Sequence, residues 1–147
     1  MKWVFIVIGG VVALIVLLAL IGAFLPRDHR ATSTISLRQP PDTVWKALQE
    51  IGSAGFDVPI ITLESVPPRR MVTQIDPKAK QPFGGTWTFE LTPESGGTRV
   101  TVTEAGWISN TIFRTLARFS FGYYGSLDKY LKALGTRLGE TVHPTHS

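Results

Sequence analysis

The chain has 147 residues, a formal net charge of +4 and no cysteine, which excludes disulfides, thiolate nucleophiles and cysteine-ligated metal. Its lysine and arginine residues are spread out without aromatic interleaving, which argues against nucleic acid as a partner. The three histidines, His29, His143 and His146, fall outside the patterned elements, which argues against a Ser-His-Asp triad or a histidine-ligated metal site. We therefore predict no metal and no cofactor.

The segment Trp3–Leu25 is continuously apolar and carries no ionisable side chain. As a helix it would be about 34 Å long, enough to cross a hydrocarbon core of about 30 Å. A cleaved signal peptide is the alternative, but the apolar run is too long and no small-x-small cleavage site follows it. We predict that residues 1–26 are a transmembrane anchor that contacts the bilayer through residues 3–25. We expect a single-pass protein of the bacterial inner membrane, and the arginines after the span favour a cytoplasmic domain.

The rest of the chain, about 120 residues, suits one domain with one core. Residues 27–31 are short and charged and indicate a juxtamembrane linker. We assign the domain to residues 32–140, and we predict a disordered tail over residues 141–147.

Alternation in Thr32–Arg38 predicts a first strand. Two prolines followed by an apolar helical pattern then predict an amphipathic helix that ends near Gly52. Two further strands are predicted over Ile60–Val66 and Arg69–Ile75, followed by a loop rich in turn residues over 76–84.

Residues 85–107 predict a β-hairpin around a glycine-rich turn. The register that pairs Leu91 with Val100 places Trp87 opposite Glu104. Glu104 is therefore a carboxylate at the end of an otherwise apolar face. The apolar members of that face are Trp87, Phe89, Leu91, Val100 and Val102.

From Asn110 the apolar spacing changes to three and four, which predicts one long helix with an apolar stripe over residues 112–138. Basic residues on its other side, Arg114 among them, predict a solvated face that could also dock on an anionic bilayer. Gly122 and Gly125 each cost about 1 kcal/mol relative to alanine within a helix, so they indicate either a bend or a close backbone approach. The order of elements predicts an α+β fold in which the sheet and the last helix cover each other.

Four segments resemble, in order and spacing, the START-like or SRPBCC superfamily, often labelled polyketide cyclase/dehydrase: RQPPDTVWKAL, ESVPPRRMVTQI, PFGGTWTFELTPESGGTRVTVTEAG and NTIFRTLARFSFGYYGSLDKYLKALGTRLGE. The resemblance covers about residues 32–140 and consists of fold signatures. It implies a helix-grip fold, in which a curved antiparallel sheet wraps a long C-terminal helix around a hydrophobic cavity. Members of the superfamily bind lipids, sterols, polyketides or quinones, and some catalyse cyclisation in the cavity.

Glu104 has two interpretations. It is either the polar group that orients an apolar ligand, and a weak candidate for a general base, or a wet carboxylate at the sheet rim or beside Asn110. Carboxylates at sheet edges are ordinary, which favours the second interpretation. Tyr123 either directs its hydroxyl into the cavity or packs in the core. The residues that we expect to line a cavity are Met71, Trp87, Phe89, Val102, Glu104, Phe119, Tyr123 and Leu127; all but Val102, Glu104 and Tyr123 are expected in the core in any case.

Three functions follow. The leading one is a membrane-anchored domain that binds or transfers a hydrophobic ligand (lipid, quinone or polyketide-like) without catalysis, since tethering places it where such ligands reside. The second is a cyclase or dehydratase that uses Glu104 and a tyrosine, weakened by the poor set of acid-base groups. The third is a membrane-tethered interaction scaffold with a filled interior.

Overall fold

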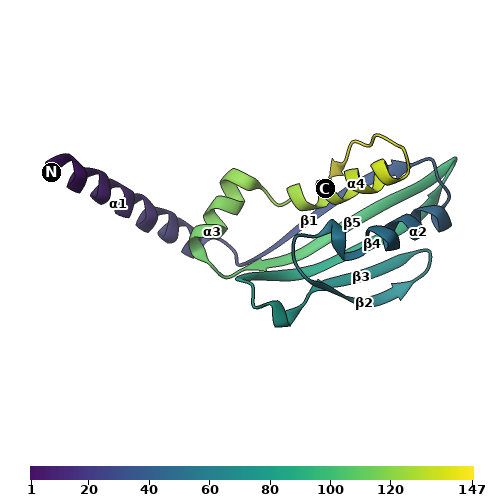
Figure 1. Cartoon of the computed structure of the whole chain (residues 1–147), viewed down its shortest axis with the longest axis horizontal. Coiled ribbons are helices and arrows are strands. Elements are labelled where there is room, and N and C mark those ends of the chain that lie inside the picture. The colour runs from purple at the N-terminus through teal and green to yellow at the C-terminus, as the bar shows by residue number, and fades with distance from the viewer.

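The computed structural model describes residues 1–147 as a projecting N-terminal helix followed by an α+β domain (Figure 1). The helix is α1 (Lys2–Phe24), and Gly22 is its only buried residue. It is also the one helix in the chain that is long and apolar enough to cross a membrane.

A six-stranded antiparallel sheet forms the body of the domain. Its strands are β1 (Asp28–Leu37), β2 (Ile60–Val66), β3 (Arg70–Ile75), β4 (Phe83–Glu94), β5 (Gly97–Ile108) and β6 (Thr145–His146). Their spatial order is β2-β3-β4-β5-β1-β6. The hairpin of β4 and β5 has the predicted register, with Leu91 paired with Val100 and Trp87 paired with Glu104.

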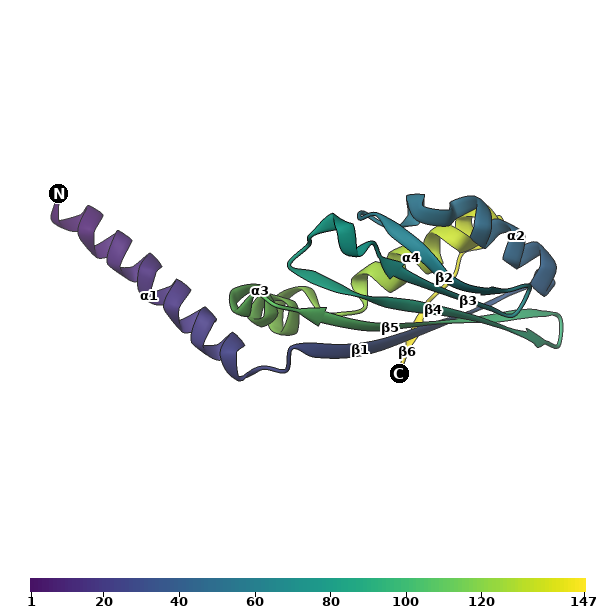
Figure 2. The same ribbon diagram turned by 90° about the horizontal axis from the view of Figure 1, so that it is seen from below.

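Two helices, α2 (Pro41–Ile51) and α4 (Gly125–Arg137), cover the same face of this sheet (Figure 2). Two short 3-10 helices, η1 (Gly52–Gly55) and η2 (Pro77–Ala79), lie in the connections. The core fills the space between the helices and the sheet, and its fully buried members include Val44, Leu48, Phe89, Tyr130 and Leu134. The predicted α+β architecture with a curved antiparallel sheet is confirmed.

The prediction of a single uninterrupted C-terminal helix is wrong, because the structure divides this segment into three pieces. These are α3 (Thr111–Leu116), a π-helical turn η3 (Ala117–Phe121) and α4. Gly122 has φ +71°, a left-handed conformation that favours glycine, and it ends η3. The glycines therefore mark a bend.

The bend corrects two predictions about side chains. Phe119 is 68% exposed rather than in the core, because the apolar stripe leaves the sheet at the break. Arg114 is buried rather than part of a solvated basic face.

Strand β1 begins at Asp28, so the prediction of a linker over residues 27–31 is wrong. The physical reason is the length of β5, whose last residues need an antiparallel partner. His29 pairs with Gly106, and Asp28 pairs with Trp107. His29 therefore lies in a regular strand, contrary to the prediction.

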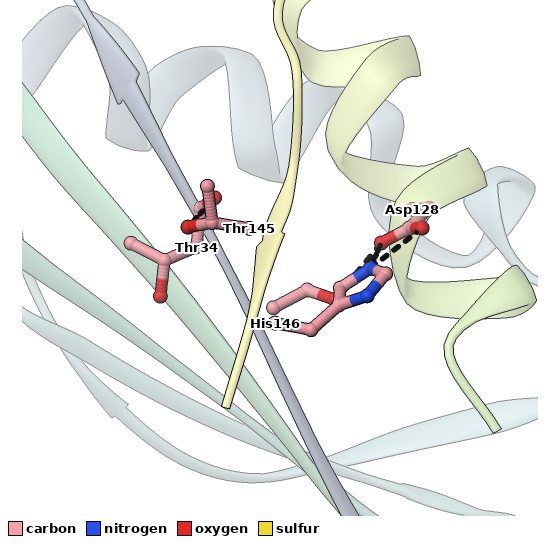
Figure 3. A network of polar contacts seen from close by, with 5 residues as sticks. Thr34, Asp128, Thr145 and His146 are labelled. Carbon is pink, nitrogen blue, oxygen red and sulfur yellow. Dashed lines mark hydrogen bonds and ion pairs between the residues drawn. The ribbon is translucent and has the colours of Figure 1, made fainter.

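The C-terminal tail forms a short strand instead of being disordered. His146 lies opposite Ser33 on the free edge of β1, whose unpaired backbone groups attract a partner. Figure 3 shows that His146 Nε2 contacts both carboxylate oxygens of Asp128 on α4, at 2.9 and 3.0 Å. The His146 ring also stacks on Tyr124 at a centroid distance of 4.0 Å. The tail thus connects the sheet edge to α4.

Candidate functional site

A pocket of about 370 Å³ lies between the α1-proximal end of the sheet and the helical segment that precedes α4. The first residues of β1, the near ends of β4 and β5, and the α3–α4 segment all contribute to it. Much of its wall is apolar, including Phe56, Val58, Ile75, Phe83, Phe113 and Phe121. A ligand in this pocket would therefore meet mainly hydrocarbon and aromatic surface.

Glu104 is the acidic centre of a polar cluster in this wall. Its Oε1 accepts a hydrogen bond from His29 Nε2 at 2.9 Å. Its Oε2 accepts from Trp87 Nε1 at 3.0 Å and from Ser126 Oγ at 3.2 Å. The Glu104 side chain is only 12% exposed, and Asn110 caps its own helix by accepting from Phe113 N. The prediction of a wet rim carboxylate or a contact with Asn110 is therefore wrong.

His29 is held in one orientation by three neighbours. Its ring stacks on Tyr123 with a centroid distance of 4.2 Å and an interplanar angle of 13°. On the neighbouring strand, a Cβ at Gly106 would lie 2.6 Å from a ring carbon, so only glycine leaves room for the imidazole. Because the carboxylate of Glu104 can only accept, the hydrogen-bond pattern assigns the ring hydrogen to Nε2. The second nitrogen, Nδ1, is buried without a partner.

The structure divides the sequence-predicted site residues into four groups. Trp87, Glu104 and Tyr123 line the pocket with His29. Met71 lines a different pocket. Phe119 is exposed. The remaining three, Phe89, Val102 and Leu127, are buried in the core and line neither pocket.

His29 and Ser126 were missed by the sequence reasoning. A signal for His29 was present, since continuing the alternation of Leu37, Ile35 and Ser33 backwards along the strand puts residue 29 on the same inner face. Ser126 carried no such signal, because a serine at the start of a helix is common at the surface.

A second pocket, also of about 370 Å³, shares Phe56 with the first in its lining. The Phe56 ring is 4.7 Å from the Trp87 ring and 4.9 Å from the Tyr130 ring. Two hydroxyls in the lining of this second pocket, those of Thr73 and Tyr130, are buried without a partner. Burial raises the pKa of the Tyr130 phenol.

The chemistry of the first pocket follows from its donors and acceptors. The carboxylate already accepts three hydrogen bonds. Within this cluster the nitrogen without a partner is His29 Nδ1, a hydrogen-bond acceptor in the neutral ring, and it is covered by neighbouring protein atoms, so a ligand reaches it only if these atoms move. No group of three or more His, Asp or Glu side chains is placed to hold a metal ion. The site can therefore bind a mainly apolar molecule, and a donor on that molecule would meet Nδ1 only after a local rearrangement of the wall.

Solved structures share this fold at low sequence identity. A protein from Mesorhizobium loti is 15% identical with a TM-score of 0.54, and the match covers 76% of this chain and 97% of that one. A protein from Rhizobium leguminosarum is 16% identical with a TM-score of 0.55, covering 76% and 96%. A conserved protein from Geobacillus kaustophilus is 14% identical with a TM-score of 0.55, covering 80% and 100%. At these identities the likeness shows the fold alone.

No curated protein sequence matches the chain. A family profile described as Activator of Hsp90 ATPase homolog 1-like protein matches residues 29–134, well over half of the chain. This match and the structural neighbours confirm the SRPBCC resemblance. The chain therefore belongs to the Activator of Hsp90 ATPase homolog 1-like family.

Proposed function

We propose that this protein is a membrane-tethered domain that binds a hydrophobic small molecule without transforming it. The observation that carries the proposal is the polar cluster of Glu104 and His29 in a pocket whose wall is mainly apolar. Binding sites for small molecules generally combine apolar walls with a few fixed polar groups that orient the ligand. The SRPBCC fold supports the same class of ligand.

The volume of the pocket limits the size of the ligand. At about 370 Å³ it lies at the lower end of the range for small-molecule sites, roughly 300–1,000 Å³. If each non-hydrogen group occupies roughly the 30 Å³ of a water molecule, the pocket holds about twelve of them. One hydrocarbon chain of moderate length or a small ring system fits, whereas a whole two-chain lipid does not.

The unpaired His29 Nδ1 defines the polar end of the ligand. A buried acceptor without a partner costs about 1–3 kcal/mol, and a ligand hydroxyl or amide N–H that displaces the atoms covering Nδ1 and donates to it recovers part of this cost. A ligand with a donor should therefore bind on the order of ten- to a hundredfold more tightly than an isostere without one.

The tether in this proposal is α1. Its apolar window has no buried residue in the structure, so a bilayer would supply the surroundings that the protein does not. Tethering raises the concentration of the domain at the membrane, where apolar ligands dissolve. We place the protein in the bacterial inner membrane with the domain on the cytoplasmic side.

Two matched probes test the binding function. Decanol can donate a hydrogen bond, whereas decyl methyl ether has a similar shape and cannot. Native mass spectrometry of the full chain, released from lipid nanodiscs, should show a decanol adduct that forms at lower concentration than the ether adduct. His29→Phe keeps an aromatic ring against Tyr123 and should abolish the preference, while His143→Phe in the exposed tail should not. No adduct with either probe would refute the proposal.

A second candidate function, acid-base catalysis, is favoured by the same hydrogen bond. The sequence reasoning lacked a histidine in a patterned element, and the structure supplies His29 with its Nε2 held by Glu104. Nδ1 would then accept a proton from a carbon next to a ligand carbonyl, as in cyclases and dehydratases. Incubation with a long-chain β-diketone in D₂O tests this, since deuterium uptake should be faster with the wild type than with His29→Phe.

A further inference from the structure

The short helix α3 packs against the last turns of α1 rather than on the sheet (Figures 1 and 2). Arg114 Nη1 donates to the carbonyl oxygens of Gly22 at 2.9 Å and Leu25 at 3.0 Å. Thr115 Oγ1 donates to the carbonyl oxygen of Leu18 at 2.7 Å. Two polar side chains of α3 thus bind backbone acceptors along the C-terminal end of α1.

The two helices also touch through their backbones. A Cβ at Gly22 would lie 1.7 Å from the carbonyl oxygen of Thr111. No side chain can be placed there unless the helices separate. The contact therefore fixes where α3 lies along α1, and glycine is the residue that permits it.

We call this contact between α3 and the C-terminal end of α1 the joint. It fixes the depth of α3 if α1 spans the bilayer. The 23 residues of α1 extend about 34 Å and the hydrocarbon core is about 30 Å thick, so only a few Å are left over. The contacts of α3 run from Leu18 to Leu25, which is about 10 Å along the helix axis. Consequently α3 lies beside the part of α1 that passes from the acyl chains to the headgroups.

The surface of α3 and η3 suits that position. Phe113, Phe119 and Phe121 are 42%, 68% and 65% exposed, and the last two are the most exposed large apolar side chains of the chain after α1. The guanidinium of Arg118 lies 5.9 Å from the centre of the Phe119 ring. Aromatic rings beside arginine are favourable at the membrane interface, where the ring meets acyl chains and the cation meets phosphates.

The same segment is a wall of the candidate ligand site. Phe113, Ala117 and Phe121 line the pocket that contains Glu104 and His29. We propose that residues 111–121 lie in the membrane interface and form the lipid-facing door of this pocket. An amphiphile with one polar end passes through it directly between the acyl chains and the polar cluster. This inference rests on the proposed binding function and adds the partner surface and the route.

Single-cysteine labelling tests the depth of the door, because the natural chain has no cysteine. Full-length Phe119→Cys and Ser95→Cys variants would carry the fluorophore NBD in vesicles of phosphatidylcholine and phosphatidylglycerol. Ser95 is exposed in the β4–β5 turn, at the end of the domain away from α1 (Figure 1). We expect lipids with a nitroxide near the headgroup to quench the label at 119 several-fold more than the label at 95. Equal quenching, with equal access of iodide from water, would overturn the inference.

A matched pair of glycine variants tests the joint. Gly22→Val must push α3 away from α1 and should reduce the quenching of the label at 119. Gly10→Val adds the same side chain where nothing lies within 4 Å, and it should leave the quenching unchanged. Equal effects of the two variants would overturn the role of the joint.

Binding of decanol separates the two proposals. If the label at 119 is quenched no more than the label at 95 and decanol still binds, the door is overturned and the binding function stands. If the label at 119 is quenched as expected but the protein binds neither decanol nor its methyl ether, the binding function and the door are both overturned. Only the contact of residues 111–121 with the membrane then stands.

Discussion

Replacing Glu104 with glutamine preserves the shape of the side chain and changes the direction of one hydrogen bond. The carboxylate accepts from His29 Nε2 on one oxygen and from Trp87 Nε1 on the other. An indole N–H can only donate, so the amide oxygen of glutamine must face Trp87 and its NH₂ group must face His29. We predict that Glu104→Gln moves the imidazole hydrogen from Nε2 to Nδ1.

The cost to stability follows from the three hydrogen bonds. Bonds to a charged group contribute about 1.5–3 kcal/mol each and neutral bonds about 0.5–1.5, so the loss is about 1 kcal/mol per bond. Easier burial of the neutral amide offsets part of this, which leaves a decrease of about 1–3 kcal/mol in the free energy of unfolding. Glu104→Ala leaves the partners unpaired and should cost more, about 3–5 kcal/mol.

Two measurements check these values. Long-range ¹H–¹⁵N correlation spectra of histidine-labelled protein distinguish an imidazole nitrogen that carries hydrogen from one that does not. His143, which is exposed in the tail, provides an internal reference. Denaturant unfolding of the full chain in detergent micelles gives the two free-energy differences.

The ligand preference gives a third readout. With hydrogen on Nδ1, His29 offers a donor instead of an acceptor at this nitrogen, so Glu104→Gln should weaken the preference for decanol and favour decyl methyl ether. A wild-type protein with hydrogen on Nδ1, or a glutamine variant with an unchanged tautomer, would refute the reasoning that Glu104 sets the polarity of this site.

Three further predictions concern other residues. Tyr130→Phe removes an unpaired buried hydroxyl and should raise the free energy of unfolding by about 1 kcal/mol. Burial raises the pKa of Tyr130, so just above pH 10.0 this phenol ionises in the unfolded wild type and stays neutral in the folded one. The free energy of unfolding of the wild type should therefore fall as the pH rises above 10.0, and denaturant titrations should show a smaller fall in Tyr130→Phe. Gly106→Ala should displace the His29 ring and abolish the preference for decanol in native mass spectra, whereas Gly10→Ala, at a position of α1 with nothing within 4 Å and outside the pocket, should not. His146→Ala should speed hydrogen exchange in the C-terminal strand without altering probe binding.

The hairpin of β4 and β5 was predictable because its information is local. A short turn sets the register of an antiparallel pair, and alternation then assigns each side chain to a face. Pairing Leu91 with Val100 was sufficient to place Trp87 opposite Glu104. The direct bond from the indole to the carboxylate follows from that register.

The partner of Glu104 on β1 was not predictable in the same way. Residues 27–31 are rich in charge and were predicted to be a linker. They form a strand because β5 extends to Ile108 and offers a free edge, a pairing between segments some 75 residues apart in the chain. Local periodicity carries no information about such a pairing, so His29 was left out of the site.

The break in the last helix was hidden by the continuity of its pattern. Phe119 and Tyr123 follow the helical spacing of the buried stripe, yet Phe119 lies outside the core. Periodicity reports which side chains share a face and not what the face contacts. The segment instead packs against α1 through Arg114, a residue whose charge predicted a solvated position.

The polar cluster and the joint with α1 lie at the same end of the sheet, and the hydrophobic effect gives a reason for this. His29 follows Leu25 by four residues, which is at most about 14 Å of extended chain. Moving a ten-carbon chain from lipid through water would expose roughly ten methylene groups at about 0.8 kcal/mol each, a barrier of about 8 kcal/mol. A pocket that opens to the acyl chains removes most of this barrier, because the tail of the ligand stays in hydrocarbon while its polar end reaches Glu104 and His29. A pocket at the opposite end of the sheet would bind the same ligand equally well and exchange it far more slowly.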